Sequence, residues 1–376
     1  MKKITILLFI LSNISIFAQD KFITELKNLT EKKEYKKIID EYSTKNNDYS
    51  AESLYQIGQA FYMLEDDNNC VKFMNLAIVK NPNDSKPYFI LGSTQNYMKK
   101  YDDAIKSFES AIKIDSAESK FYCRLADSYY AQNKIELALN SYLNATKQQN
   151  AENREFSMVA QLYSEMKNDA KALEAFYIAK SKIDKESDSY INALFNIGLL
   201  ETKNDNYEKS EIAYLELIKL SPNDFHSFAK LIQIYYHKKE YEKANPLKEK
   251  LYSEYKKGNL KDNLKDMFCY DQFNWNNKLI QCFERFQETS KDIFKKHIFY
   301  VVNEKDEIDY RIQTEFSPIS VEQGYEKYVL CASKGNEHYT YGIGFNDNLK
   351  YEDLKQSVIQ ILEDKIKPVA SSRPNK

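Results

Sequence analysis

Residues 51–84 read AESLYQIGQAFYMLEDDNNCVKFMNLAIVKNPND, and residues 85–118 read SKPYFILGSTQNYMKKYDDAIKSFESAIKIDSAE. The two stretches follow one pattern of bulky and small apolar residues, and two further stretches of the same length continue it. Each unit carries one small residue early and a second one twelve positions later: Gly58 and Cys70, Gly92 and Ala104, Ala126 and Ala138, Ala160 and Ala172. Self-similarity over four consecutive units is the signature of a repeat protein, so the repeat decides the fold.

The spacing within a unit has a mechanical meaning. Bulky apolar residues lie three or four positions apart, as at Leu54 and Ile57, and this places one apolar stripe on each of two short antiparallel helices. The small residue of the first helix is expected to face the small residues of the second, so that the two axes approach closely. One helix pair cannot bury its own stripe, but stacking on the next pair does.

This pattern resembles the tetratricopeptide repeat, a helix–turn–helix unit of 34 residues whose copies stack into an α-solenoid. The resemblance is strong over residues 51–184. After Asp184 the register slips by four residues, because Gly198 lies 38 positions after Ala160, and the pattern then resumes. A degenerate unit precedes residue 51. We therefore predict a tetratricopeptide-like array of about seven units over residues 19–257, which is expected to fold without the rest of the chain.

The composition agrees with a mainly α fold and excludes some partners. The chain has 376 residues with only 8 Gly and 7 Pro, fewer than a loop-rich all-β fold would use. A formal net charge of −2 gives no general attraction to nucleic acid or to an anionic membrane. The aromatic residues also lack an interleaved basic patch, so no nucleic-acid partner is predicted.

Residues 1–18 have the layout of a cleavable secretory signal. Lys2 and Lys3 precede an apolar run, and Ala18 offers a small residue for cleavage before a polar stretch. The run is short and interrupted for a membrane span, although a retained N-terminal anchor is the alternative. No later stretch is apolar enough to span a membrane. We therefore expect export to the periplasm or the outside of the cell.

Residues 265–367 are expected to form a small α+β domain that resembles no family known to us. Alternating apolar residues predict strands near residues 308–316 and 338–345, and continuous apolar runs predict strands at residues 297–302 and 328–332. Residues 278–286 are a further candidate strand, and residues 354–366 carry the stripe of a closing helix. The expectation is an antiparallel sheet of four or five strands with one helix, followed by a disordered tail at residues 368–376.

The resemblance implies that the first helix of each unit lines a concave groove that holds a peptide or a protein. The lining positions carried onto this chain are Tyr55, Tyr62, Met63, Phe89, Asn96, Tyr97, Asp127, Tyr130, Gln161, Phe195 and Tyr236. Many are aromatic and few are charged, and the basic residues with which some family members clamp a terminal carboxylate are absent from them. The alternative is that these tyrosines are packing residues, abundant because the composition is rich in Tyr.

Catalytic motifs are missing from the sequence. No HExxH, GxSxG or phosphate-binding loop occurs, and Gly342-Ile343-Gly344 lacks the rest of a dinucleotide loop, so no catalytic, cofactor or metal residue and no small-molecule substrate are predicted. Arg311, Gln313 and Glu315 are expected on one strand face, and His338 and Thr340 on another. If the two faces coincide, they form a polar cluster, although a half-buried sheet has a polar face in any case.

The five cysteines show no metal-ligand spacing and read as small buried hydrophobes, with a Cys282–Cys331 bridge as the alternative should their strands be neighbours. The prediction from the sequence is an exported, non-catalytic interaction scaffold. One alternative is an enzyme or ligand-binding protein whose site lies on the α+β domain, with the repeats as a docking or oligomerisation module. Another is a structural role in which the sheet caps the repeats or mediates self-association.

Overall fold

The computed structural model describes residues 23–44, 49–260, 267–288, 293–305, 307–316, 328–335, 337–345 and 350–369. The chain forms two compact units, which divide between Ala193 and Leu194. Each unit is treated on its own. The predicted signal at residues 1–18 lies outside the described residues, and none of the described helices is long and apolar enough to cross a membrane.

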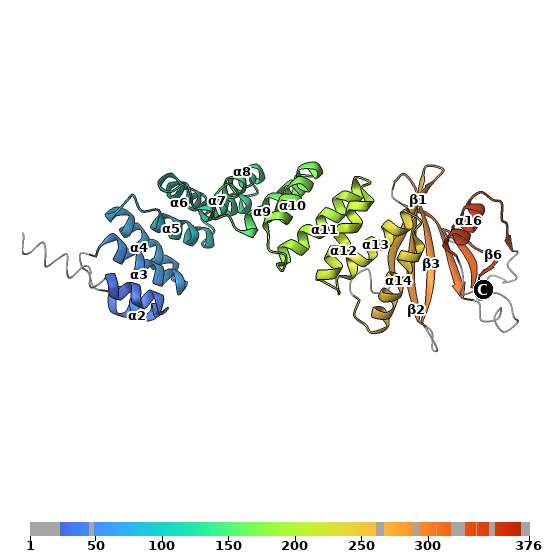
Figure 1. Ribbon diagram of the computed structural model, residues 1–376, viewed down its shortest axis with the longest axis horizontal. Helices are drawn as coiled ribbons and strands as arrows, with labels where there is room; N and C mark the ends of the chain where they lie inside the picture. Colours follow the sequence, from blue (N-terminus) through green and yellow to red (C-terminus); the bar gives the residue numbers. More distant parts are fainter. Residues whose placement is uncertain are drawn as a thin grey trace, which may run out of the picture. The chain divides into compact units, whose positions relative to one another are not determined.

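Antiparallel helix pairs make up the first part of the chain (Figure 1). The described residues hold seven pairs, which confirms the predicted number. They are residues 23–31 with α2 (Tyr35–Tyr42), α3 (Ala51–Met63) with α4 (Asp67–Lys80), α5 (Ser85–Tyr97) with α6 (Tyr101–Ile114), α7 (Ser119–Ala131) with α8 (Ile135–Ala145), α9 (Asn153–Glu165) with α10 (Asp169–Lys182), α11 (Asp188–Lys203) with α12 (Tyr207–Leu220), and α13 (Phe225–His237) with α14 (Tyr241–Lys256).

The turn inside every pair has the same backbone geometry. Its second residue has a positive φ, at Lys33, Glu65, Lys99, Asn133, Lys167, Asp205 and Lys239. The next N–H then donates to the carbonyl five residues earlier, as from Lys100 to Gln95 and from Asn168 to Tyr163. This is the Schellman closure of a helix end, and it reverses the chain within a few residues. The 38-residue step from Lys167 to Asp205 reproduces the predicted register slip.

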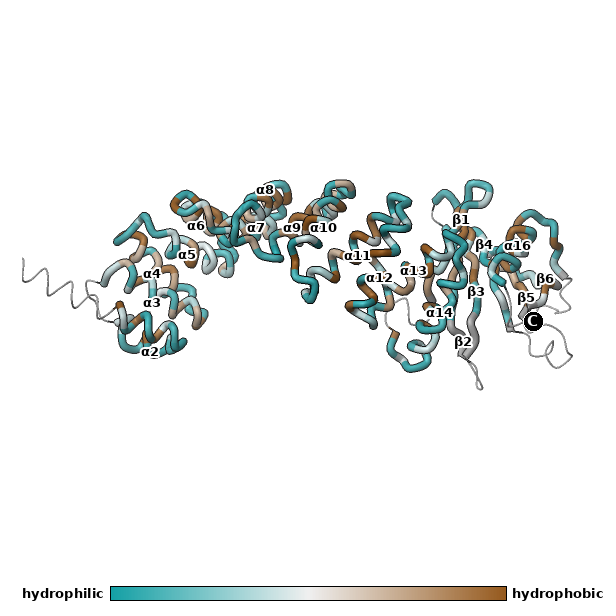
Figure 2. Tube along the Cα trace, viewed as in Figure 1, coloured by the Kyte–Doolittle hydropathy of each residue, from teal (hydrophilic) through white to brown (hydrophobic). Residues whose placement is uncertain are grey.

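The packing inside a pair differs from the prediction in one respect. Hydrophobic and hydrophilic residues alternate along α3 to α12 (Figure 2), as the apolar stripes require. The small residue of the first helix, however, faces a bulky side chain of the second. A Cβ added at Gly92 would lie 2.8 Å from the Phe108 ring, and one at Gly198 would lie 2.6 Å from the Tyr214 ring. The absent Cβ therefore makes room for an aromatic ring.

The second unit contains a sheet of seven antiparallel strands whose order in space is their order in the chain. They are β1 (Met267–Trp275), β2 (Lys278–Glu288), β3 (Ile293–Val302), β4 (Ile308–Phe316), β5 (Tyr328–Lys334), β6 (Glu337–Phe345) and β7 (Pro368–Val369), with α16 (Tyr351–Leu362) between the last two. The predicted four or five strands are thus too few. β1 went unrecognised, and β7 occupies two residues of the expected tail, of which residues 370–376 lie outside the described range.

One face of the sheet, here called the covered face, carries the hydrophobic core. Ile280, Phe299, Ile312, Leu330 and Tyr341 alternate onto it from successive strands, as the strand register requires. Buried residues of α13, α14 and α16 belong to the same core: Leu231, Ile232, Tyr236, Leu251, Leu354, Val358 and Ile361. The predicted closing helix therefore packs where its stripe requires.

A β-bulge shapes this face at β1. The pairing with β2 shifts between Cys269 and Asp271, which leaves Tyr270 as the extra residue. The side chains of Tyr270 and Asp271, which are consecutive in the chain, consequently lie on the same face of the sheet. The Tyr270 ring packs against the Tyr236 ring of α13, with the two ring centres 4.9 Å apart. Asp271 accepts a hydrogen bond from the Tyr351 hydroxyl of α16.

A buried ion pair joins α14 to the sheet. Lys248 of α14 pairs with Glu284 of β2, donates to the hydroxyl of Tyr236 at 2.8 Å and lies 4.8 Å above the Tyr270 ring. Residues of the last repeat and of the sheet are thus packed into one unit.

The suggested Cys282–Cys331 bridge is excluded. Cys282 lies in β2 and Cys331 in β5, with two strands between them. At about 4.8 Å per strand step the separation is about 14 Å, twice what a disulfide spans. All five cysteines are free thiols.

Candidate partner-binding surface

The first helices of successive repeats lie side by side. α3 contacts α5, and α5 contacts α7, in addition to the contacts that each helix makes within its own pair. Side chains at matching positions of these helices therefore share one side of the repeats in the first unit. The first-helix surface is defined here as the predicted groove residues of α3, α5, α7 and α9.

Two classes of side chain occur on this surface. Tyr97 is 68% exposed, Met63 is 47% exposed and Tyr130 is 37% exposed. Tyr55, Tyr62 and Phe89 are only partly exposed and pack on the core beneath, and burial raises the pKa of Tyr55 to about 12. The open, aromatic part of the surface thus lies at the C-terminal ends of the first helices.

Polar residues at the same ends connect neighbouring repeats. The Tyr130 hydroxyl of α7 donates to Glu165 Oε1 of α9 at 3.1 Å, and Gln161 Nε2 donates to the same oxygen at 2.9 Å. Asn96 directly precedes Tyr97 and occupies in α5 the repeat position that Tyr130 occupies in α7, and its Oδ1 is buried without a hydrogen-bond partner in the part of the chain that the structure describes. A buried acceptor without a partner is costly, which makes Asn96 a candidate to accept from a bound group.

Asp127 is the centre of an ion-pair network. Arg154 of the next repeat binds it through two N–H groups, at 2.7 Å and 3.1 Å, and Arg124 binds it at 3.2 Å. The Tyr142 hydroxyl donates to it from below. The hydrogen bond from Arg154 to Asp127 raises the pKa of the arginine, and burial raises the pKa of the nearby Cys123 thiol to about 12. The two arginines therefore compensate the negative charge of Asp127, and Asp127 holds both side chains in place.

Basic residues of the same helices lie beside the predicted lining positions. Besides Arg124 and Arg154, Lys120 of α7 has its Nζ 5.8 Å from the centre of the Phe89 ring. Lys120 and Arg154 could have been identified from the sequence, because Lys86, Lys120 and Arg154 follow one another at the repeat length. The pairing of Arg154 with Asp127 crosses between repeats, so the pattern within one unit did not reveal it.

Two predicted groove residues belong to the second unit, and one of them is not accessible. Phe195 is partly buried, and its ring packs edge-on against Tyr214 with the two ring centres 5.8 Å apart. Tyr236 is 5% exposed and lies between Tyr241, Tyr270 and Tyr351, at ring distances of 5.2, 4.9 and 4.8 Å. The prediction of Tyr236 as an open groove residue is thus wrong, because the sheet and α16 cover the position.

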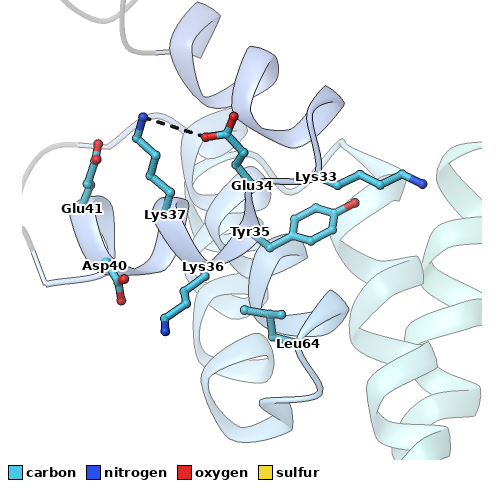
Figure 3. Close-up of a pocket in the computed structure, with 8 residues that line it drawn as sticks. All are labelled: Lys33, Glu34, Tyr35, Lys36, Lys37, Asp40, Glu41 and Leu64. Carbon is cyan, nitrogen blue, oxygen red and sulfur yellow. Dashed lines mark ion pairs between the residues drawn. The ribbon is translucent and has the colours of Figure 1, made fainter.

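A separate pocket of about 500 Å³ lies in the first repeats (Figure 3). It is lined by Leu64 and by Lys33, Glu34, Tyr35, Lys36, Lys37, Asp40 and Glu41. Lys37 and Glu34 pair with each other at 3.9 Å. The three lysines are matched by three carboxylates, so the pocket presents no net charge to a ligand.

Comparisons with known families and solved structures bear on the helical repeats. Residues 85–118 and 191–224 match the family model described as tetratricopeptide repeat. The C-terminal part of a repeat-containing protein from Cytophaga hutchinsonii is 14% identical, with a TM-score of 0.50 over 60% of this chain and 92% of that one.

Two further structures are similar at lower TM-scores. YrrB, described as a protein of this repeat class with an unusual peptide-binding site, is 17% identical over 46% of this chain and 88% of its own, with a TM-score of 0.40. PilF from Pseudomonas aeruginosa is 16% identical over 54% and 90%, also at 0.40. No curated protein matches the sequence, and the α+β part matches no family model. Two stretches of the chain thus match the tetratricopeptide repeat, and the helical part consists of tetratricopeptide-like helical repeats.

Proposed function

We propose that the protein is an exported, non-catalytic scaffold that holds a peptide or protein partner on the first-helix surface of its repeats. The observation that carries the proposal is the exposure of Met63, Tyr97 and Tyr130 at the ends of adjacent first helices. Exposed apolar groups that gather on one side of a molecule mark interaction sites. Tyrosine suits such a site because it covers a large area at a small cost in side-chain entropy.

The charged residues beside these aromatics define the partner further. Asp127 is shared by Arg124 and Arg154, so this group keeps one net positive charge. Asn96 adds an acceptor that lacks a partner within the described residues. These features favour a polypeptide that combines apolar side chains with an acidic one and whose backbone N–H can reach Asn96.

Export is the part of the proposal that rests on residues 1–18 alone. It predicts that the protein made in its source organism starts after Ala18 and is found in the envelope or outside the cell. N-terminal sequencing of the purified native protein tests this, and an intact N-terminus on a protein in the cytoplasmic fraction would contradict it.

A ligand site on the α+β unit is the second candidate, and one observation favours it. The strand register brings Arg311, Gln313, His338 and Thr340 onto one face of the sheet, as the sequence suggested. The described residues contain no group of three or more His, Cys, Asp or Glu side chains placed to hold a metal ion. Of the two alternatives for the α+β unit, an enzyme or a ligand-binding protein, these residues favour ligand binding at this face.

The test of the scaffold is site-specific cross-linking in the source organism. A photo-reactive phenylalanine derivative at Tyr97 should form a covalent adduct with the partner, which mass spectrometry then identifies. The same group at Val79, which is 80% exposed on α4, is the matched control and should form none.

The identified partner then permits a quantitative test. Met63→Ala, Tyr97→Ala and Tyr130→Ala together should weaken its binding by at least about 2 kcal/mol, the loss typical of one hot-spot side chain. Leu76→Ala, Val79→Ala and Ile178→Ala remove three exposed apolar side chains from second helices and should leave binding unchanged. Equal binding by the two triple variants, both folded by circular dichroism, would refute a first-helix site.

A further inference from the structure

The second face of the sheet, here called the open face, differs in character from the covered face. The buried side chains of α13, α14 and α16 belong to the core on the covered face. The opposite side carries two cross-strand rows that the register defines. One row is Phe283, Ile298, Gln313, Cys331 and Thr340, and the other is Gln281, Tyr300, Arg311, Ser333 and His338.

Two buried atoms on this face have no hydrogen-bond partner among the described residues. Gln313 is 8% exposed, and its Oε1 accepts no hydrogen bond from any described residue, although its Nε2 donates to Glu315 at 2.6 Å. Arg311 Nε, two residues away on the same strand, likewise has no acceptor within the described part of the sheet. An ordinary wet sheet face would solvate such atoms, but these are shielded from solvent. Buried polar atoms without partners are rare and need a cause, and a bound group is one.

The same face concentrates positive charge. Lys296 lies opposite Arg285 across β2 and β3, and the Lys296 ammonium is 3.8 Å from Glu315. Burial lowers the pKa of Lys296, and the charges of Arg311 and Arg285 lower it further, whereas Glu315 acts in the opposite direction. Lys296, Arg285 and Arg311 therefore place three cations on this face, where Glu315 pairs with Lys296, on a chain whose net charge is −2.

We propose that the open face around Gln313 binds an acidic peptide segment, with a carboxylate held by Lys296 and Arg311 and a neighbouring peptide N–H donated to Gln313 Oε1. A carboxylate supplies the acceptor that Arg311 lacks, and a peptide N–H supplies the donor that Gln313 lacks. The aromatic pair Phe283 and Tyr300, at a ring distance of 5.5 Å, offers an apolar contact beside the charges. Glu315 disfavours a free phosphate, because a dianion would meet it at close range.

This site is separate from the first-helix surface, and it deepens the second candidate function, a ligand site on the α+β unit. Its test is calorimetric titration of the full chain with acetyl-tetraglutamate amide, with acetyl-tetraglutamine amide as the neutral probe and inorganic phosphate as the small anion. The acidic peptide should bind, the neutral peptide should not, and phosphate should bind at least about tenfold more weakly.

Four variants locate the site. Lys296→Gln and Arg311→Gln should each weaken the acidic peptide by about tenfold, the order expected for one charge-assisted hydrogen bond. Glu315→Gln removes the repelling carboxylate and should strengthen binding several-fold, a gain that misfolding cannot imitate. Lys305→Gln, at an exposed turn between β3 and β4, is the control for loss of one charge and should change nothing.

The outcomes are decisive in either direction. Weakening at Lys296 and Arg311 together with a gain at Glu315 supports the proposal. No binding of the acidic peptide overturns it, as does binding that Glu315→Gln leaves unchanged. Equal binding of phosphate would show a simple anion site, and loss of binding only in the Met63, Tyr97 and Tyr130 triple variant would place the acidic peptide on the repeats.

Discussion

Ala126 tests the repeat register at a single side chain. It occupies in α7 the position that Gly92 occupies in α5, and it is fully buried. At Gly92 even one added carbon would meet the Phe108 ring, so this position has no spare volume. Ala126→Leu should therefore overpack the helix pair and lower the free energy of unfolding by about 1–3 kcal/mol.

The measurement for Ala126→Leu is urea unfolding followed by circular dichroism. Ala131→Leu, at the exposed end of the same helix, makes the same chemical change and should stay within about 0.5 kcal/mol of the unmodified protein. Equal stability of the two variants would mean that the helix faces are assigned incorrectly.

Individual side chains show how far the sequence led to the candidate site. The lining positions carried over from the repeat family placed Tyr97 and Tyr130 on first helices, and both side chains are exposed there. They failed at Tyr236, because what covers it comes from strands and a helix far along the chain. They also missed the role of Asp127, since Arg154 reaches it from the following repeat. Contacts within one helical repeat were predictable, whereas contacts between repeats, or between a repeat and the sheet, were not.

The link between α14 and β2 depends on one buried ion pair. Glu284 is 1% exposed and pairs with Lys248, and His297 Nδ1 lies 3.8 Å from the same carboxylate. Lys248→Met removes the lysine from this buried carboxylate and should cost about 3–5 kcal/mol, whereas Lys248→Met combined with Glu284→Leu should recover most of the loss.

Trp275 can report on unfolding of the second unit, because it is the sole Trp of the chain and packs on the core of that unit. Its fluorescence during thermal unfolding should show a large drop in midpoint for Lys248→Met. Lys106→Met, which removes an exposed pair with Asp103, should show almost none. A double variant as unstable as the single one would mean that Lys248 acts through the tyrosine rings and not through Glu284.

Whole elements were predicted with uneven success, and the reason is physical. Helix pairs and strands such as β4 have a strict period, which the sequence displays. β1 does not, because its bulge breaks the alternation between Cys269 and Asp271 and puts Tyr270 and Asp271 on one side. β7 has two residues, too few to show any period.

The domain boundaries themselves stay a prediction, and the structure suggests where to cut the chain. A fragment of residues 19–257 was expected to fold alone, yet it would expose Ile232 and Leu251 and leave Lys248 without Glu284. Fragments 19–184 and 185–376 separate the chain in the connection between α10 and α11. Both should be soluble and cooperatively folded.

Hydrogen exchange is the measurement for the fragments. In the fragment that ends at residue 257, the amides of α13 and α14 should exchange much faster than in fragment 185–376, while α3 to α10 should be protected equally in fragments 19–257 and 19–184. Full protection of α13 and α14 without the sheet would show that the repeats carry their own stability to the end, as repeat arrays with capping units do.

The strand order has a consequence for synthesis. Every strand of the sheet pairs only with its neighbours in the chain, from β1 to β7. A nascent polypeptide emerging from the ribosome therefore never has to wait for a distant partner, since each new segment finds its template in the one made just before it. Loop closure stays local, so the entropic barrier to nucleation is low for a β structure. The same order leaves a fresh, unpaired edge at each stage of translation, and the edge is protected only when the next segment arrives.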